Sequence, residues 1–223
     1  MFRDDYVLRH IRLFVQFLAR IFGLIESDDL DLALELLRQA FRDYLGVDME
    51  SLLTIPEERL LDFLTFGERG GLGLSKCSFA ITLLKQTGEV LRAKGRPDQA
   101  QAYLEKSLSL LLETRLAAEE DLDFPDFTPT VDDLLARAGE RKLSIDTRAT
   151  LVFYLEREGQ YARAAEILEG MRADQPDNQE VLDLGASFFE YLLDESDAAL
   201  EKGGLTRAGL REKLDSWASG DRQ

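Results

Sequence analysis

Hydrophobic residues along the chain recur at intervals of three and four positions, the pattern of amphipathic α-helices. The chain contains 41 Leu but only 14 Val and Ile together, and a shortage of β-branched residues disfavours strands. We therefore expect an all-α protein of about 9 to 11 helices with no β-strand.

Capping residues, Gly and Pro interrupt this pattern and mark the ends of the helices. The expected helices cover residues 5–25, 28–45, 57–66, 75–94, 97–116, 131–138, 145–158, 161–173, 178–193 and 206–217. Asp28 is expected to cap the second helix with its carboxylate. The glycine-rich segment 67–73 is expected to be a hinge loop.

Two segments have related patterns, 64 residues apart. The stronger one, 145–178, contains Gly159, Tyr161, Ala164, Leu168 and Pro176. It resembles a tetratricopeptide repeat (TPR), a unit of two antiparallel helices. The resemblance implies that the Gly permits the turn, the aromatic ring packs back, the Ala allows close approach and the Pro ends the unit.

The weaker copy, 81–114, contains Gly88, Gly95, Ala100 and Leu104 at the corresponding positions. Both copies depart from the TPR pattern, at Pro97 and Leu112 in the first and at Arg148, Val152 and Met171 in the second. Because the displacement is not a multiple of the 34-residue TPR unit, the resemblance implies an irregular right-handed stack of antiparallel helix pairs.

The expected organisation has three parts. Residues 1–118 form an amino-terminal helical part, and 119–130 form an acidic linker. Residues 131–223 form a carboxy-terminal helical part that ends in capping helices. We expect the parts to form one continuous stack.

The order of elements carries a second resemblance. A pattern from Asp5 to Arg9 opens an apolar helix, a Leu- and Ala-rich helix ends at Leu45 and Gly46, and a TPR-like hairpin follows. This order is similar to an uncharacterised bacterial family classified as a domain of unknown function. The resemblance implies a bacterial cytoplasmic protein and brings no activity or cofactor.

Charge narrows the class of partner. Lys and Arg total 27 against 43 Asp and Glu, giving a formal net charge of −16 that repels nucleic-acid phosphates. We expect no nucleic-acid binding. A single cysteine, Cys77, excludes an intramolecular disulfide, so we expect a cytoplasmic location.

Candidate chemistry is sparse. Cys77 has only one histidine in the chain to serve as its base, His10, which lies on the apolar first helix. The acidic residues near 121–126 lack the glycine and closing glutamate of a calcium loop, and segment 67–73 lacks a phosphate-binding lysine. We expect no catalytic residue, metal site or cofactor, and a buried Cys77.

The helix over 5–25 has a narrow polar stripe on a largely apolar circumference. It could be a central buried helix, a homodimer seam or a helix at a membrane surface. The narrow stripe favours burial, and a membrane contact is the least expected because a broad basic face is missing. Gln16 and Arg20 interrupt the apolar run, so neither an export signal nor a membrane span is expected.

These observations favour a non-enzymatic interaction or scaffold module. The TPR resemblance implies a groove lined by the first helix of each repeat, at Thr82, Lys85, Glu89, Arg92, Asp146, Ala149, Phe153 and Glu156. Their mixed charge indicates an extended or helical peptide of mixed or basic character. One alternative is a structural homo-oligomer assembled through residues 5–25, and another is an enzyme of unrecognised type.

Overall fold

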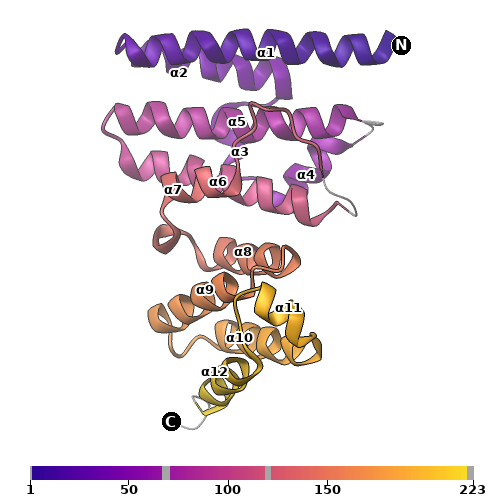
Figure 1. Ribbon diagram of the computed structural model, residues 1–223. Coiled ribbons are helices and arrows are strands. Elements are labelled where there is room, and N and C mark those ends of the chain that lie inside the picture. The colour runs from indigo at the N-terminus through magenta and orange to yellow at the C-terminus, as the bar shows by residue number, and fades with distance from the viewer. Residues whose placement is uncertain (1, 67–70, 119–121, 220–223) are drawn as a thin grey trace. The chain divides into compact units, whose positions relative to one another are not determined.

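The structure is a computed structural model that describes residues 2–66, 71–118 and 122–219. These residues form twelve α-helices and no strand, so the expected all-α class is confirmed for the described part of the chain. The chain divides into two compact units, residues 1–140 and 141–223 (Figure 1).

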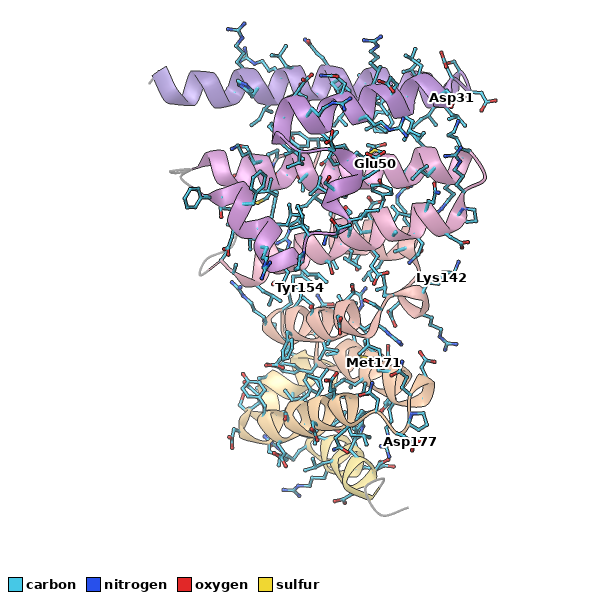
Figure 2. All side chains as sticks on the ribbon, turned by 180° about the vertical axis from the view of Figure 1, so that it is seen from behind. Asp31, Glu50, Lys142, Tyr154, Met171 and Asp177 are labelled. Carbon is cyan, nitrogen blue, oxygen red and sulfur yellow. The ribbon has the colours of Figure 1, made fainter. Side chains whose placement is uncertain are left out.

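The first unit contains seven α-helices and one π-helical turn at Phe41–Leu45. The α-helices are α1 (Phe2–Glu26), α2 (Leu30–Ala40), α3 (Met49–Leu52), α4 (Glu57–Thr65), α5 (Gly71–Ala93), α6 (Pro97–Leu116) and α7 (Val131–Ala138). Asp31, at the start of α2, accepts a 2.6 Å hydrogen bond from Lys94 just after α5, which ties the two helices together (Figure 2).

The core of the first unit is the antiparallel hairpin of α5 and α6. Gly95 ends α5 with a φ of +70°, a conformation that glycine adopts without strain, and Pro97 begins α6. Gly88 lies against the side chain of Leu104, so the two helix backbones approach closely. Most side chains of both helices are buried because α2, α4 and α7 cover the hairpin.

Helix α1 is the outer helix of this unit and packs on α2 and α5 (Figure 1). Phe14 is fully buried and packs among aromatic rings at centroid distances of 4.4 Å to Phe79, 5.0 Å to Phe127 and 5.1 Å to Tyr44. The opposite side of α1 is exposed. The favoured interpretation of α1 as a central buried helix is therefore wrong, because only one of its faces is covered within the first unit.

The second unit contains α8 (Ile145–Arg157), α9 (Tyr161–Asp174), α10 (Gln179–Tyr191), α11 (Asp197–Lys202) and α12 (Arg207–Ser219). Helices α8 and α9 form an antiparallel hairpin whose turn contains Gly159 at a φ of +67°. Tyr161, Ala164 and Leu168 of α9 are buried, and Pro176 follows the end of α9.

The carboxy-terminal helices close this unit. Trp217 of α12 lies over Gly185 of α10 and packs against Phe189 with the two rings tilted, at a centroid distance of 5.7 Å. Arg172 of α9 lies 4.9 Å above the Trp217 ring, and its guanidinium donates to the carbonyl of Ser216. Side chains from α9 and α10 therefore hold α12 in place.

Several expectations about individual elements are wrong. The short helices α3 and α11 are additional, and α5 begins at Gly71 although 67–73 was expected to be a loop; residues 67–70 lie outside the described residues. Asp28 has a φ of +59° instead of capping α2, whose N-cap residue is Asp29. Helix α7, expected in the carboxy-terminal part, packs on α6 of the first unit.

Candidate functional site

Three of the four candidate groove residues of α5, Lys85, Glu89 and Arg92, contact α7. Thr82 is buried, and its hydroxyl donates to the Ser78 carbonyl at 2.7 Å. The Lys85 ammonium lies 3.5 Å from the Asp133 carboxylate. Glu89 accepts a hydrogen bond from the Arg137 guanidinium.

The Arg92 guanidinium adds a further hydrogen bond between α5 and α7 by donating to the Arg137 carbonyl at 2.7 Å. Hydrogen bonds from Arg137 to Asp133 and Glu89 raise the pKa of the guanidinium, because both carboxylates favour its charged form. Lys85, Glu89 and Arg92 are thus paired with a helix of the same chain. Lys85 and Glu89 are half-buried and Arg92 is exposed, so a partner that binds Lys85 or Glu89 would compete with α7.

The candidate residues of α8 are more accessible. Asp146 and Phe153 are exposed, with 49% of Phe153 accessible, and Ala149 and Glu156 are half-buried. The other side of α8, which includes Leu151 and Leu155, is buried. The four candidate residues therefore share the accessible side of α8.

Two residues that the sequence pattern did not indicate lie beside Glu156. The Tyr191 hydroxyl donates to the Glu195 carboxylate at 3.2 Å, and the Glu195 charge acts on Glu156, Tyr161 and Tyr191. Tyr191 is 49% exposed. We call Phe153, Glu156, Tyr191 and Glu195 the acidic aromatic surface; the first two belong to α8, and the last two flank the 3₁₀ turn Leu192–Asp194.

The electrostatics of this surface are unbalanced. Burial and, to a smaller extent, the neighbouring charge of Glu195 raise the pKa of Glu156. Within the described part of the chain, neither Glu156 nor Glu195 forms an ion pair with Lys or Arg. A bound cationic group would relieve the repulsion between the two carboxylates.

Several of the residues predicted to pack the repeats lie close to other segments of their own unit. Gly88 contacts Leu104 and the Ala100 carbonyl, where an added Cβ would lie 2.6 Å from Leu104 Cγ. In the second unit, the Tyr161 ring contacts Gly203, and the Ala162 amide donates to the Gly203 carbonyl at 2.8 Å. The turn between α8 and α9 is therefore fixed by the segment after α11.

Cys77 is fully buried in α5, as expected. Burial raises the pKa of its thiol to about 11, partly offset by a hydrogen bond with Thr114. It borders a cavity of about 340 Å³ that is otherwise lined mainly by apolar groups, including Leu61, Leu74 and Leu122. A thiol in these surroundings is protonated at neutral pH and is a poor nucleophile.

Another hollow, of about 560 Å³, lies between α2, α3 and α6 and has a mixed lining that includes Arg38, Glu50 and Tyr103. The Arg38 guanidinium donates to Glu50 at 3.1 Å, so these two charges neutralise each other. Across the residues that the structure describes, no group of three or more His, Cys, Asp or Glu side chains could hold a metal ion. None of the described helices has both the length and the apolar character needed to cross a membrane.

The described residues define an all-helical protein. The model of a family described as a family of unknown function (DUF6483) matches residues 1–219, so the chain belongs to this family. The similarity to a domain of unknown function is thereby confirmed. No curated protein matches the chain, and no solved structure matches it.

Proposed function

We propose that the protein is a non-enzymatic interaction module that binds a basic segment of a partner protein on the acidic aromatic surface of its second unit. The observation that carries this proposal is the pair of side-chain carboxylates of Glu156 and Glu195, which form no ion pair within the described residues and lie beside the exposed rings of Phe153 and Tyr191. The Arg207 guanidinium donates to the backbone carbonyl of Glu195 and not to its carboxylate.

A Lys or Arg side chain suits this surface for two reasons. Its charge offsets the repulsion from Glu195, which adds to the effect of burial in raising the Glu156 pKa, and its N–H groups donate to the carboxylates. The faces of Phe153 and Tyr191 can also attract a cation through their π electrons, a contribution of about 0.5–1 kcal/mol at exposed sites. A segment that combines basic and apolar residues would use both kinds of contact.

The TPR resemblance supports the same surface, and TPR-like packing is part of this proposal. Phe153 and Glu156 lie on α8, the first helix of the α8–α9 hairpin. In TPR proteins the first helix of each repeat lines the binding groove. The Gly159 turn and the buried Tyr161, Ala164 and Leu168 are further support. The proposal also includes the bacterial cytoplasmic setting that the resemblance implies.

Only the α8 half of the expected groove belongs to this binding surface. The α5 residues already form contacts with α7 or with backbone of the first unit; they are Thr82, Lys85, Glu89 and Arg92. A partner would have to break these contacts in order to bind there, and the free energy that this costs disfavours binding to α5. The expected binding energy therefore comes from the second unit.

A peptide-display selection tests the proposal. The full-length protein is used to select from a naive library of random short peptides, and the enriched peptides are synthesised with a fluorescent label and titrated. We expect enrichment of Lys or Arg next to an apolar residue. Replacing both carboxylates, with Glu156→Gln and Glu195→Gln, should weaken binding about tenfold or more.

The matched control is Glu158→Gln with Glu180→Gln, which removes two exposed carboxylates from the same unit away from the surface. This variant should bind like the wild type. Selection of acidic or uncharged sequences, or equal weakening by both double variants, would contradict the proposed surface.

A further inference from the structure

The exposed side of α1 carries a line of apolar residues that the first unit leaves uncovered. Leu8, Val15 and Phe22 are 49%, 46% and 47% exposed. They are spaced by seven residues, so they share one face of the helix. Ile11 is half-buried at the edge of this line, toward the covered face. We call Leu8, Val15, Ala19 and Phe22 the outer stripe.

The centre of the outer stripe permits close approach of another helix. Ala19 is exposed, and an added Cβ on Gly23 would have no neighbour within 4 Å. Val15 lies about one helical turn before Ala19, and Phe22 lies beside Gly23. A bulky side chain from a facing helix could fill the space above Ala19 and Gly23.

Two charged residues of opposite sign flank the stripe symmetrically. Arg12 and Glu26 are exposed, and each is seven residues from Ala19. Among the described residues neither forms an ion pair. If two α1 helices cross in antiparallel orientation at Ala19, Arg12 of each helix lies opposite Glu26 of the other.

We propose that two copies of the chain associate through their outer stripes, with the α1 helices antiparallel and crossing near Ala19. A parallel pair would place Arg12 beside Arg12 and Glu26 beside Glu26, and such like-charge contacts oppose association. This dimer uses the first unit and is independent of the peptide site proposed on the second.

The charge pattern also favours a second copy over a membrane as the occupant of the stripe. Glu26 lies in line with the apolar residues, and Asp28 and Asp29 are exposed just beyond it. A helix that binds an anionic membrane surface needs basic residues along its polar face. Arg9, Arg12 and Arg20 are exposed, but Glu26, Asp28 and Asp29 make the end of α1 acidic, which suits Arg12 of an antiparallel partner.

The size of the contact predicts a reversible dimer. A helix of 25 residues is about 37 Å long, and the outer stripe occupies most of it. A contact confined to one helix of each copy belongs to the small end of specific interfaces, so we expect a dimer that dissociates on dilution.

Sedimentation velocity of the full-length protein over a range of concentrations tests the association. Phe22→Glu should weaken the dimer about tenfold or more, because it buries a carboxylate in the seam. Leu13→Glu is the matched control, since Leu13 is 47% exposed and lies half a helical turn out of phase with Phe22. Circular dichroism and thermal unfolding establish that each variant is folded.

Charge reversal tests the proposed pairing. Arg12→Glu and Glu26→Arg should each weaken the dimer, and the double variant should restore it because the opposite charges again face each other. Arg20→Glu makes the same change of charge as Arg12→Glu at an exposed site off the stripe, and it should have little effect.

Cysteine cross-linking tests the orientation. Ala19→Cys should form a disulfide-linked dimer under mild oxidation, because the crossing point brings the two copies of residue 19 together. Arg12→Cys should not, since an antiparallel pair separates its two copies by about 21 Å along the helices. Native Cys77 is buried and does not compete.

Four results would overturn the proposal: a monomer at all concentrations, a dimer insensitive to Phe22→Glu, failure of the double charge reversal to restore association, or efficient cross-linking of Arg12→Cys. A monomer that binds phosphatidylglycerol vesicles and loses this binding with Phe22→Glu would instead assign the stripe to a membrane surface.

Discussion

At the scale of single residues, close contact decides which glycines are needed for packing. An added Cβ at Gly88 would lie 2.6 Å from the Leu104 side chain and 3.1 Å from the Ala100 carbonyl. At Gly170, also within a helix, the same atom would have no neighbour within 4 Å. An Ala substitution at Gly88 therefore tests the packing contact, whereas the same substitution at Gly170 tests only the helix propensity of the backbone.

Replacing Gly88 with Ala should destabilise the protein by about 1–3 kcal/mol, because the α5–α6 hairpin must shift to admit the methyl group. Gly170→Ala should instead stabilise it by about 0.5–1 kcal/mol, because Ala has the higher helix propensity and no clash arises. Urea unfolding measures both. Equal effects of the two substitutions on the free energy of unfolding would show that the hairpin accepts a methyl group at Gly88 without cost.

Cys77 provides a residue-scale prediction about pH. Its thiol pKa is raised to about 11 from an ordinary value of 9.0, so at pH 8 the thiolate should be about 100-fold scarcer than in the unfolded chain. Labelling with an iodoacetamide probe should be slowed at least to this extent. Labelling of the native protein at the rate of the urea-unfolded protein would contradict the buried environment.

The same shift predicts a loss of stability at alkaline pH. The unfolded state releases the thiol proton near pH 9 and the folded state only near pH 11, so the unfolded state holds fewer protons in this window. The free energy of unfolding should therefore fall as the pH rises from about 9 to about 11. Cys77→Ala should remove this part of the decline, which urea titrations at several pH values can measure.

At the scale of elements, the contact of α12 with α10 depends on a single glycine. An added Cβ at Gly185 would lie 2.1 Å from the Trp217 ring. Gly185→Ala should displace α12 and expose Trp217, the chain's only tryptophan, which is now 6% exposed. We expect a red shift of the fluorescence emission and a loss of about 1–3 kcal/mol from this overpacking. Unchanged emission would contradict the described packing of α12.

Local signals predicted the helices well where a side chain caps the backbone. Thr130 and Ser144 each accept a hydrogen bond from the amide three residues later, and Asn178 caps α10 in a similar way. Asp28 was mispredicted because the chain turns through a positive φ there. Short α3 and α11 are too brief for a helical period to be visible.

Long-range contacts could not be predicted from these local patterns. Nothing in the sequence around Lys85 or Glu89 indicates that α7 covers them, because Asp133 and Arg137 lie more than forty residues away. Tyr191 and Glu195 were missed for a related reason: the turn at Leu192–Asp194 brings them to Glu156, and they belong to no repeat pattern.

At the scale of the whole molecule, the net charge of −16 should assist association with a basic partner. Long-range attraction mainly raises the association rate and is screened by salt. The association rate of a selected basic peptide should therefore fall steeply from low to high salt while its dissociation rate changes less. Stopped-flow fluorescence measures both, and a salt-independent association rate would exclude electrostatic steering.

Hydrogen–deuterium exchange of the full-length protein, with and without a selected basic peptide, tests the proposed interaction module most directly. We expect slower exchange around Phe153 to Glu156 and Tyr191 to Glu195, with α5 and α7 unchanged. The variant that carries Glu156→Gln and Glu195→Gln should show no such protection. Protection confined to α5 and α7, or protection unaffected by the two substitutions, would contradict the proposed binding surface.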